Sequence, residues 1–131
     1  MLAHAEQAVY DAHIGTRSSA FIKVTDANIF VAGLVGGFGG HLGKSVGAHS
    51  FFNAATSVPE IHSVLHGSQV AYGILVQLGQ KTEEIEKLLP FYQSIGLPSS
   101  LADLHLDKAR EETLTQIAER MAQPCRSQRR H

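Results

Sequence analysis

The segment from residue 66 to residue 80 limits the possible folds of this chain most strongly, because its apolar residues recur at the spacing of an α-helix. One face consists of Ala71, Ile74, Leu75 and Leu78, and Val70 and Val76 extend the apolar surface almost all round. A helix that is apolar on nearly every side is stable only where other elements cover it. The pattern therefore predicts a helix over 66–80 in the interior of a helical domain.

Helical periodicity continues through most of the remaining chain, with breaks at glycine and proline. Further helices are predicted over 2–14, 17–33, 42–56, 82–95 and 107–121. Pro59 ends the third of these, Thr82 is the predicted cap of the next, and Pro90 is expected to kink or restart it. Residues 29–31 fit the start of a strand equally well, but no convincing strand pattern or repeat appears elsewhere. The sequence predicts an all-α fold of five to seven helices.

Composition narrows the class of protein. The 131 residues suffice for one compact domain, with 44% hydrophobic and 18% charged residues. A net charge of -1 gives no electrostatic footprint for nucleic acid or for an anionic membrane surface. The apolar stretches are too short and too interrupted by glycine to span a bilayer. A single cysteine, Cys125, and the lack of a signal-peptide pattern predict a cytoplasmic protein without membrane or nucleic-acid partners.

The segment 33–45 holds half of the 12 glycines and superficially resembles a phosphate-binding loop that ends in Gly43, Lys44 and Ser45. The spacing does not fit, because Phe38 stands where that motif needs its first glycine. The dinucleotide fingerprint fails as well, since Gly43 comes one place too late. We therefore expect a loop between two helices and no cofactor-binding residue in this segment.

Two of the eight histidines lie in settings that suit metal ligands. His49 lies in a small, apolar segment, where a buried imidazole needs a partner for its ring nitrogens. His66 is the first residue of the apolar helix. His62 and His66 are spaced i, i+4, but Pro59 makes the backbone there irregular, so the spacing alone does not pair them as metal ligands. From the residues alone, a hydrogen-bonded core histidine is the commoner explanation of His49. No carboxylate is obviously placed to complete a zinc or iron site.

A family resemblance favours the metal-ligand explanation of these two histidines. The chain from about residue 6 to residue 107 resembles the helical C-terminal domain of glycerol dehydrogenases, in the iron-containing alcohol dehydrogenase superfamily with its dehydroquinate synthase-like fold. The matching residues are Ala48, His49, Asn53, Thr56, His66, Gly67, Val70, Ala71, Gly73, Leu75 to Leu78 and Ser94 to Pro98.

The resemblance implies a role for four residues. His49 and His66 match the family's two metal-ligating histidines, and the metal is zinc or iron. Asn53 would orient a ligand or line the pocket, and Phe38 matches an aromatic residue of the pocket wall. In the family, an N-terminal α/β domain binds NAD, and a small polyol or alcohol is oxidised between the two domains.

The chain also departs from the family pattern. The resemblance places the family's third metal ligand, an aspartate, and the NAD-binding domain before the matching region, and we expect this chain to lack both. We therefore expect residues 1–122 to be a partial helical metal-binding domain and residues 123–131 a disordered basic tail. No catalytic residue is predicted, and the chain alone is expected to be inactive. Self-association or an N-terminal domain partner should cover its exposed surfaces.

Two other functions stay open. A dehydroquinate synthase-like relative would share the helical metal scaffold, but residues 47–52 lack the second Gly-His pair of that enzyme's first ligand region. A non-catalytic helical module that binds a partner is the third possibility.

Overall fold

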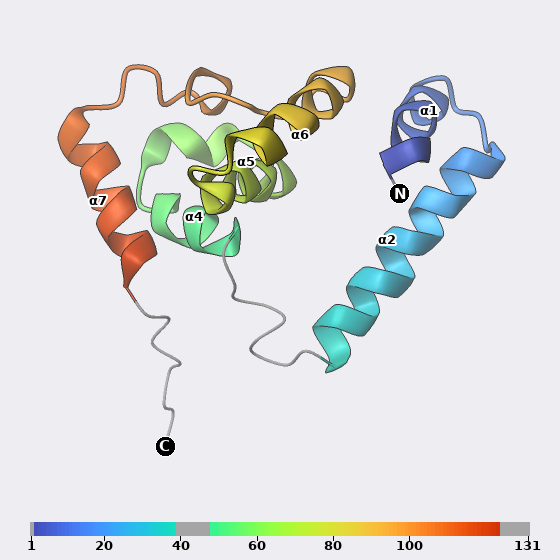
Figure 1. The fold of residues 1–131 in the computed structure, drawn as a ribbon, viewed down its shortest axis with the longest axis horizontal. Coiled ribbons are helices and arrows are strands. Elements are labelled where there is room, and N and C mark those ends of the chain that lie inside the picture. The colour runs from blue at the N-terminus through green and yellow to red at the C-terminus, as the bar shows by residue number, and fades with distance from the viewer. Residues whose placement is uncertain (1, 39–47, 124–131) are drawn as a thin grey trace.

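The computed structural model describes residues 2–38 and 48–123 as a set of helices (Figure 1). The α-helices are α1 (Leu2–His13), α2 (Ser19–Phe38), α4 (Ala48–Ala55), α5 (His66–Leu78), α6 (Thr82–Ser94) and α7 (Glu111–Ala122). Two short 3-10 helices are η1 (Pro59–Ser63) and η2 (Ala102–Leu104). Within these residues no strand occurs, so the predicted all-α class is confirmed and the strand alternative at 29–31 is wrong.

The glycine-rich segment is only partly a loop. Helix α2 runs through Gly33 and Gly37 to Phe38, so the expected loop start at residue 33 is wrong. Each glycine costs about 1 kcal/mol of helix propensity relative to alanine, yet the helix continues through both. The rest of the segment and the predicted start of the next helix, residues 39–47, lie outside the described residues, as does the predicted basic tail from residue 124.

Helices α1 and α2 form a hairpin around one buried carboxylate. Asp11 is 3% exposed and accepts hydrogen bonds from the amide of Gln7, at 2.8 Å, and from the hydroxyl of Ser18. The Ser18 oxygen in turn accepts the backbone N–H of Phe21 at 3.1 Å, which caps the first turn of α2. Gly15 takes the positive φ of 68° that the tight turn between the helices requires.

The core of the remaining chain forms around α4 and α5. Helix α7 lies along α4, and α6 lies against α5 on the other side (Figure 1). The main cluster consists of Phe51, Ala54, Ala55, Val58, Ile61, Leu104, Leu106 and Ile117. A smaller cluster joins Ala71 and Leu75 of α5 to Tyr92 of α6, whose hydroxyl donates to the Ala71 carbonyl at 2.8 Å.

Several helix boundaries differ from their predictions. Helix α6 continues through Pro90 without a restart, and Lys81 rather than Thr82 is its N-cap. The Thr82 hydroxyl instead donates to the Gln80 carbonyl at 3.4 Å. Helix α7 begins at Glu111, four residues later than residue 107, because residues 106–110 form a turn in which the Ala109 N–H donates to Leu106.

Two helices leave apolar side chains exposed. Helix α5 was predicted to be interior, but Ile74 and Val76 are 42% and 37% exposed, so only part of its surface is covered. Helix α2 lies apart from helices α4 to α7 (Figure 1), and its Ile29 and Phe30 are 71% and 69% exposed. Among the helices that the structure describes, none is long and apolar enough to cross a membrane.

Candidate metal centre

The two histidines singled out in the sequence lie side by side. His49 stands in the first turn of α4 and His66 is the first residue of α5. Their ring centroids are 5.7 Å apart, and the ring planes are inclined at 52°. His49 is half-buried and His66 is exposed, so the pair lies where an ion could reach it from solvent. The structure thus brings the two histidine rings together, whereas their ligand role stays a prediction.

An aromatic ring packs against His66. Phe52 follows His49 by three residues and so shares its face of α4. Its ring meets the His66 ring edge to face, with centroids 4.2 Å apart and an interplanar angle of 89°. This contact was not anticipated from the sequence, although the i, i+3 spacing of His49 and Phe52 was visible there.

The start of α4 is held closely against α5. The backbone N–H of Ala48 donates to Oε1 of Gln77 at 3.1 Å. The Ala48 carbonyl faces Gly73 so closely that a β-carbon there would lie 2.2 Å from the oxygen. Both backbone polar groups of Ala48 therefore meet α5 immediately before His49 in the chain.

The turn that precedes His66 is also tied to α5. Gln69 is 4% exposed, and its Nε2 donates to the carbonyl oxygens of Ile61, at 3.2 Å, and Val64, at 2.8 Å. A ring nitrogen of His62 lies 2.9 Å from the Thr56 carbonyl oxygen, which brings the end of α4 and η1 together. His62 is thus engaged with the backbone and takes no part in the histidine pair.

A cleft of about 310 Å³ opens next to His66. Its lining residues are Phe52, Thr56, Ile61, His62, Val64, His66 and Gln69. The Gln69 Oε1 is buried without a hydrogen-bond partner, although Gln69 belongs to this lining. The cleft therefore combines apolar walls with a few polar groups beside one of the candidate ligands.

The two other predicted site residues are less closely placed. Asn53 is exposed on α4, one turn after His49, and its backbone carbonyl accepts the Thr56 hydroxyl at 2.8 Å. Phe38 is the last residue of α2 and is 89% exposed. Their proposed roles beside the metal and in the pocket wall remain predictions.

The donor set of the pair suits zinc or iron in part. Imidazole nitrogen is a good ligand for both metals. In the described parts of the chain, no three His, Cys, Asp or Glu side chains gather closely enough to hold an ion. The pair thus offers two imidazole donors, and within the described residues no third donor of this kind lies beside them.

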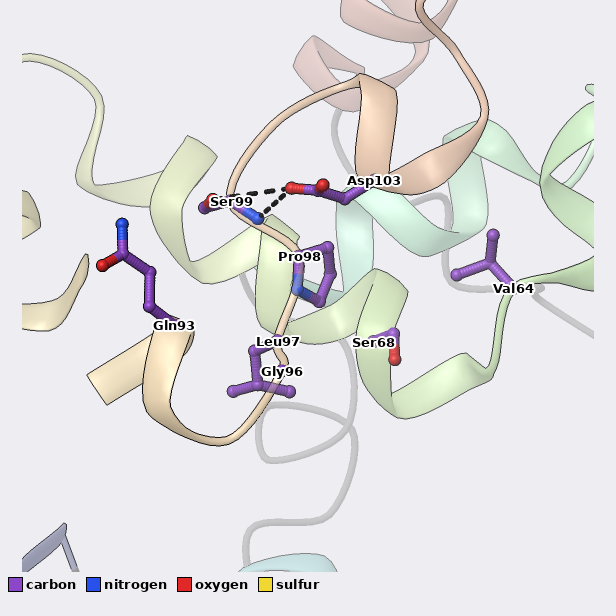
Figure 2. A pocket seen from close by; sticks show the side chains of 8 residues that line it. All are labelled: Val64, Ser68, Gln93, Gly96, Leu97, Pro98, Ser99 and Asp103. Atoms are coloured by element: carbon purple, nitrogen blue, oxygen red, sulfur yellow. Dashed lines mark hydrogen bonds between the residues drawn. The ribbon is translucent and has the colours of Figure 1, made fainter. Parts of the chain in front are cut away.

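A second cleft, of about 370 Å³, lies between the start of α5 and the turn after α6 (Figure 2). Its acidic residue, Asp103, accepts the backbone N–H groups of Ser99 at 2.9 Å and Ser100 at 2.8 Å. Hydrogen bonds from the Ser99 backbone and from Ser100 hold the pKa of the Asp103 carboxyl below its usual value. This carboxylate closes a turn and lies apart from the histidine pair.

Comparison with known proteins connects the chain to a family. No family model matches the chain. It is 42% identical to an uncharacterized oxidoreductase of Synechocystis over 78% of its own length and 29% of the relative's. It is 35% identical to hydroxycarboxylate dehydrogenase A of Escherichia coli, over 97% of this chain and 36% of that protein.

Glycerol dehydrogenases are among the other relatives. That of Citrobacter freundii is 36% identical over 79% of this chain and 28% of the enzyme. The chain spans about a third of the length of the curated relatives it matches. The resemblance proposed from the sequence is thereby confirmed, and the chain belongs to the family of glycerol dehydrogenases and related oxidoreductases.

Proposed function

We propose that residues 1–122 form the helical metal-binding part of an NAD-dependent polyol or alcohol dehydrogenase. In this proposal His49 and His66 are two ligands of one zinc or iron ion. The observation that supports it is the 5.7 Å separation of two rings that are 17 positions apart in the sequence. Two nitrogens bound to one zinc at about 2.1 Å lie within about 4.2 Å of each other, and neighbouring rings at this distance can converge so closely.

The residues of this chain would hold the metal and would not transfer protons. A divalent metal lowers the pKa of a bound alcohol hydroxyl and stabilises the negative charge on its oxygen. His49 and His66 would supply coordination, and the edge of Phe52 would keep the His66 ring in one orientation. The resemblance implies a carboxylate as third ligand, supplied by a segment outside the described residues.

The cofactor site belongs to a different part of the intact enzyme in this proposal. Dinucleotides bind where a strand leads through a glycine-rich turn into a helix, and the described residues contain no such unit. NAD and the substrate would therefore be held jointly with an α/β domain. The names of the relatives suggest a small polyol, such as glycerol, or a related hydroxy compound as substrate.

Exposed apolar surface supports an association partner. Helix α2 exposes Ile29, Phe30 and Phe38, each by more than two thirds of its surface. Burying such side chains removes apolar area from water at about 25 cal/mol per Å², which favours association. A second copy of the chain or the cofactor-binding domain is the proposed partner.

Zinc titration by calorimetry tests the metal assignment. The 131-residue chain should bind one zinc ion, and His49→Ala and His66→Ala should each weaken this binding at least tenfold. His4→Ala is the matched control, because His4 is exposed on α1 and belongs to no proposed site. If the isotherms of His49→Ala, His66→Ala and the wild type coincide, the two histidines are not ligands.

A further inference from the structure

His66 and three further residues of α5 lie on one face of that helix. His66, Gln69, Gly73 and Gln77 follow each other at intervals of three, four and four residues, which places them along a single stripe of the helix. This stripe faces α4 and η1, as the contacts of Gln69, Gly73 and Gln77 show. His66 is the proposed ligand, and the other three residues contact the segments on either side of it.

Gln77 and Gly73 fix the first residue of α4. The first N–H groups of a helix have no partner within that helix. The Ala48 N–H is such a group, and it donates to Gln77 Oε1. Gly73 lets the Ala48 carbonyl approach α5 more closely than any side chain would allow. Because His49 follows Ala48 directly, these two contacts determine how far the His49 backbone lies from α5.

Gln69 fixes the turn that leads into His66. Its two hydrogen-bond partners, the carbonyls of Ile61 and Val64, are both acceptors, so the amide orientation is unambiguous. The Val64 carbonyl lies two residues before His66. The same helix face thus holds the backbone next to both histidines.

We infer that Gln77 and Gln69, together with Gly73, are positioning residues of the histidine pair and set its geometry for a metal ion. This inference rests on the proposed function, since it assumes that the pair binds a metal. Metal ligands must be held within about 0.5 Å of their productive position. Loss of a residue that orients a ligand costs about 10- to 100-fold in metal affinity.

The test uses the full chain and four glutamine variants. Gln77→Met keeps the size of the side chain but removes the acceptor for Ala48, and Gln69→Met removes the donor to Ile61 and Val64. Gln77→Glu retains an acceptor oxygen at the same position. Gln93→Met is the control, because Gln93 is an exposed glutamine on α6 and is not part of the stripe.

Two readouts separate positioning from folding. Zinc affinity is measured by calorimetry, and the number of imidazole nitrogens on added Cu²⁺ is read from electron paramagnetic resonance spectra. The melting temperature of each metal-free variant is recorded alongside. We expect Gln77→Met and Gln69→Met to bind zinc about 10- to 100-fold more weakly and to lose one imidazole from Cu²⁺. Gln77→Glu and Gln93→Met should retain zinc affinity and both imidazoles.

The outcomes distinguish this inference from the proposed function. If the wild type binds zinc through both histidines and Gln77→Met and Gln69→Met bind equally well, the positioning role is wrong while the metal site stands. A lower melting temperature with unchanged zinc affinity and an unchanged Cu²⁺ spectrum likewise assigns the glutamines to stability alone. If His49→Ala and His66→Ala bind zinc as the wild type does, the proposed function fails and this inference fails with it.

Discussion

The carbonyl oxygen of Ala48 occupies space that a β-carbon on Gly73 would need, 2.2 Å from its ideal position. No side chain fits there, because the contact involves backbone and cannot be relieved by rotating a flexible group. The close approach of α4 to α5, and with it the approach of His49 to His66, therefore depends on a glycine in the middle of a helix.

Gly73→Ala should destabilise the chain by about 1–3 kcal/mol, because the added methyl group must push α4 away from α5. Gly67→Ala is the matched control, since Gly67 lies on the same helix with nothing within 4 Å of its missing β-carbon. There alanine should stabilise by up to about 1 kcal/mol through helix propensity. Urea denaturation measures both free energies of unfolding, and equal effects of the two substitutions would contradict the close contact.

Tyr92 should make stability fall at high pH. Burial raises the pKa of its hydroxyl above the ordinary tyrosine value of 10.0. Because its pKa is raised in the folded state, Tyr92 contributes fully to the free energy of unfolding below the unfolded pKa. This contribution is lost as pH rises through the folded pKa. Tyr92→Phe should remove this dependence above pH 10 and cost about 1 kcal/mol at neutral pH through the lost bond to Ala71.

Thermal melts from pH 7 to pH 11 measure the effect of Tyr92. Tyr10→Phe serves as the control, because Tyr10 is 60% exposed. An alkaline profile of Tyr92→Phe that matches the wild type would show that the hydroxyl does not remain buried and bonded.

Asp103 should make stability fall at low pH. Its pKa is lowered from 3.8 by hydrogen bonds from Ser99 and Ser100, so its contribution is present above the unfolded pKa and is lost as pH falls through the folded pKa. Asp103→Asn should therefore lower the melting temperature at pH 6 and lessen the difference between pH 6 and pH 3. Asp107→Asn, at an exposed site outside this turn, should leave the profile unchanged.

Helix α2 should drive association of the isolated chain. Phe30→Glu places a charge on an apolar side chain that is 69% exposed, and we expect it to reduce the oligomer population in light scattering at every concentration. Lys23→Glu changes charge on the same helix without removing apolar area, and it should leave the population nearly unchanged. A wild-type chain that stays monomeric over a wide concentration range would show that this surface does not associate.

The chain by itself should not oxidise alcohols. Holding the nicotinamide against the substrate carbon supplies about 7–11 kcal/mol of the barrier reduction, and the proposed cofactor site lies in another domain. NADH absorbance is followed with purified chain, zinc, NAD and glycerol, and then with a relative's α/β domain added. Turnover by the chain alone that disappears in His49→Ala would contradict this prediction.

Much of the helical organisation was predictable from the sequence. The periodicity of Ala71, Ile74, Leu75 and Leu78 identified α5, and Pro59 correctly marked the end of α4. Such features depend on neighbours within a few residues, so the local sequence contains most of the information. The family motif likewise singled out His49 and His66, although their spacing alone did not pair them.

Other features depended on contacts between distant segments. Sequence patterns placed the end of α2 at Gly33, whereas the helix continues to Phe38, because propensity measures only a local preference. Nothing in the sequence indicated that Gln77 would accept the Ala48 N–H, 29 residues earlier in the chain.

The sequence by itself determined the all-helical class and the family, and it singled out His49 and His66. The tertiary structure decided how far apart the two histidines lie and which glutamines bind the backbone next to them. The physical reason is that hydrogen bonds and close backbone contacts across α4 and α5 exist only when both helices are packed, and their partners are separated in the chain by up to 29 residues.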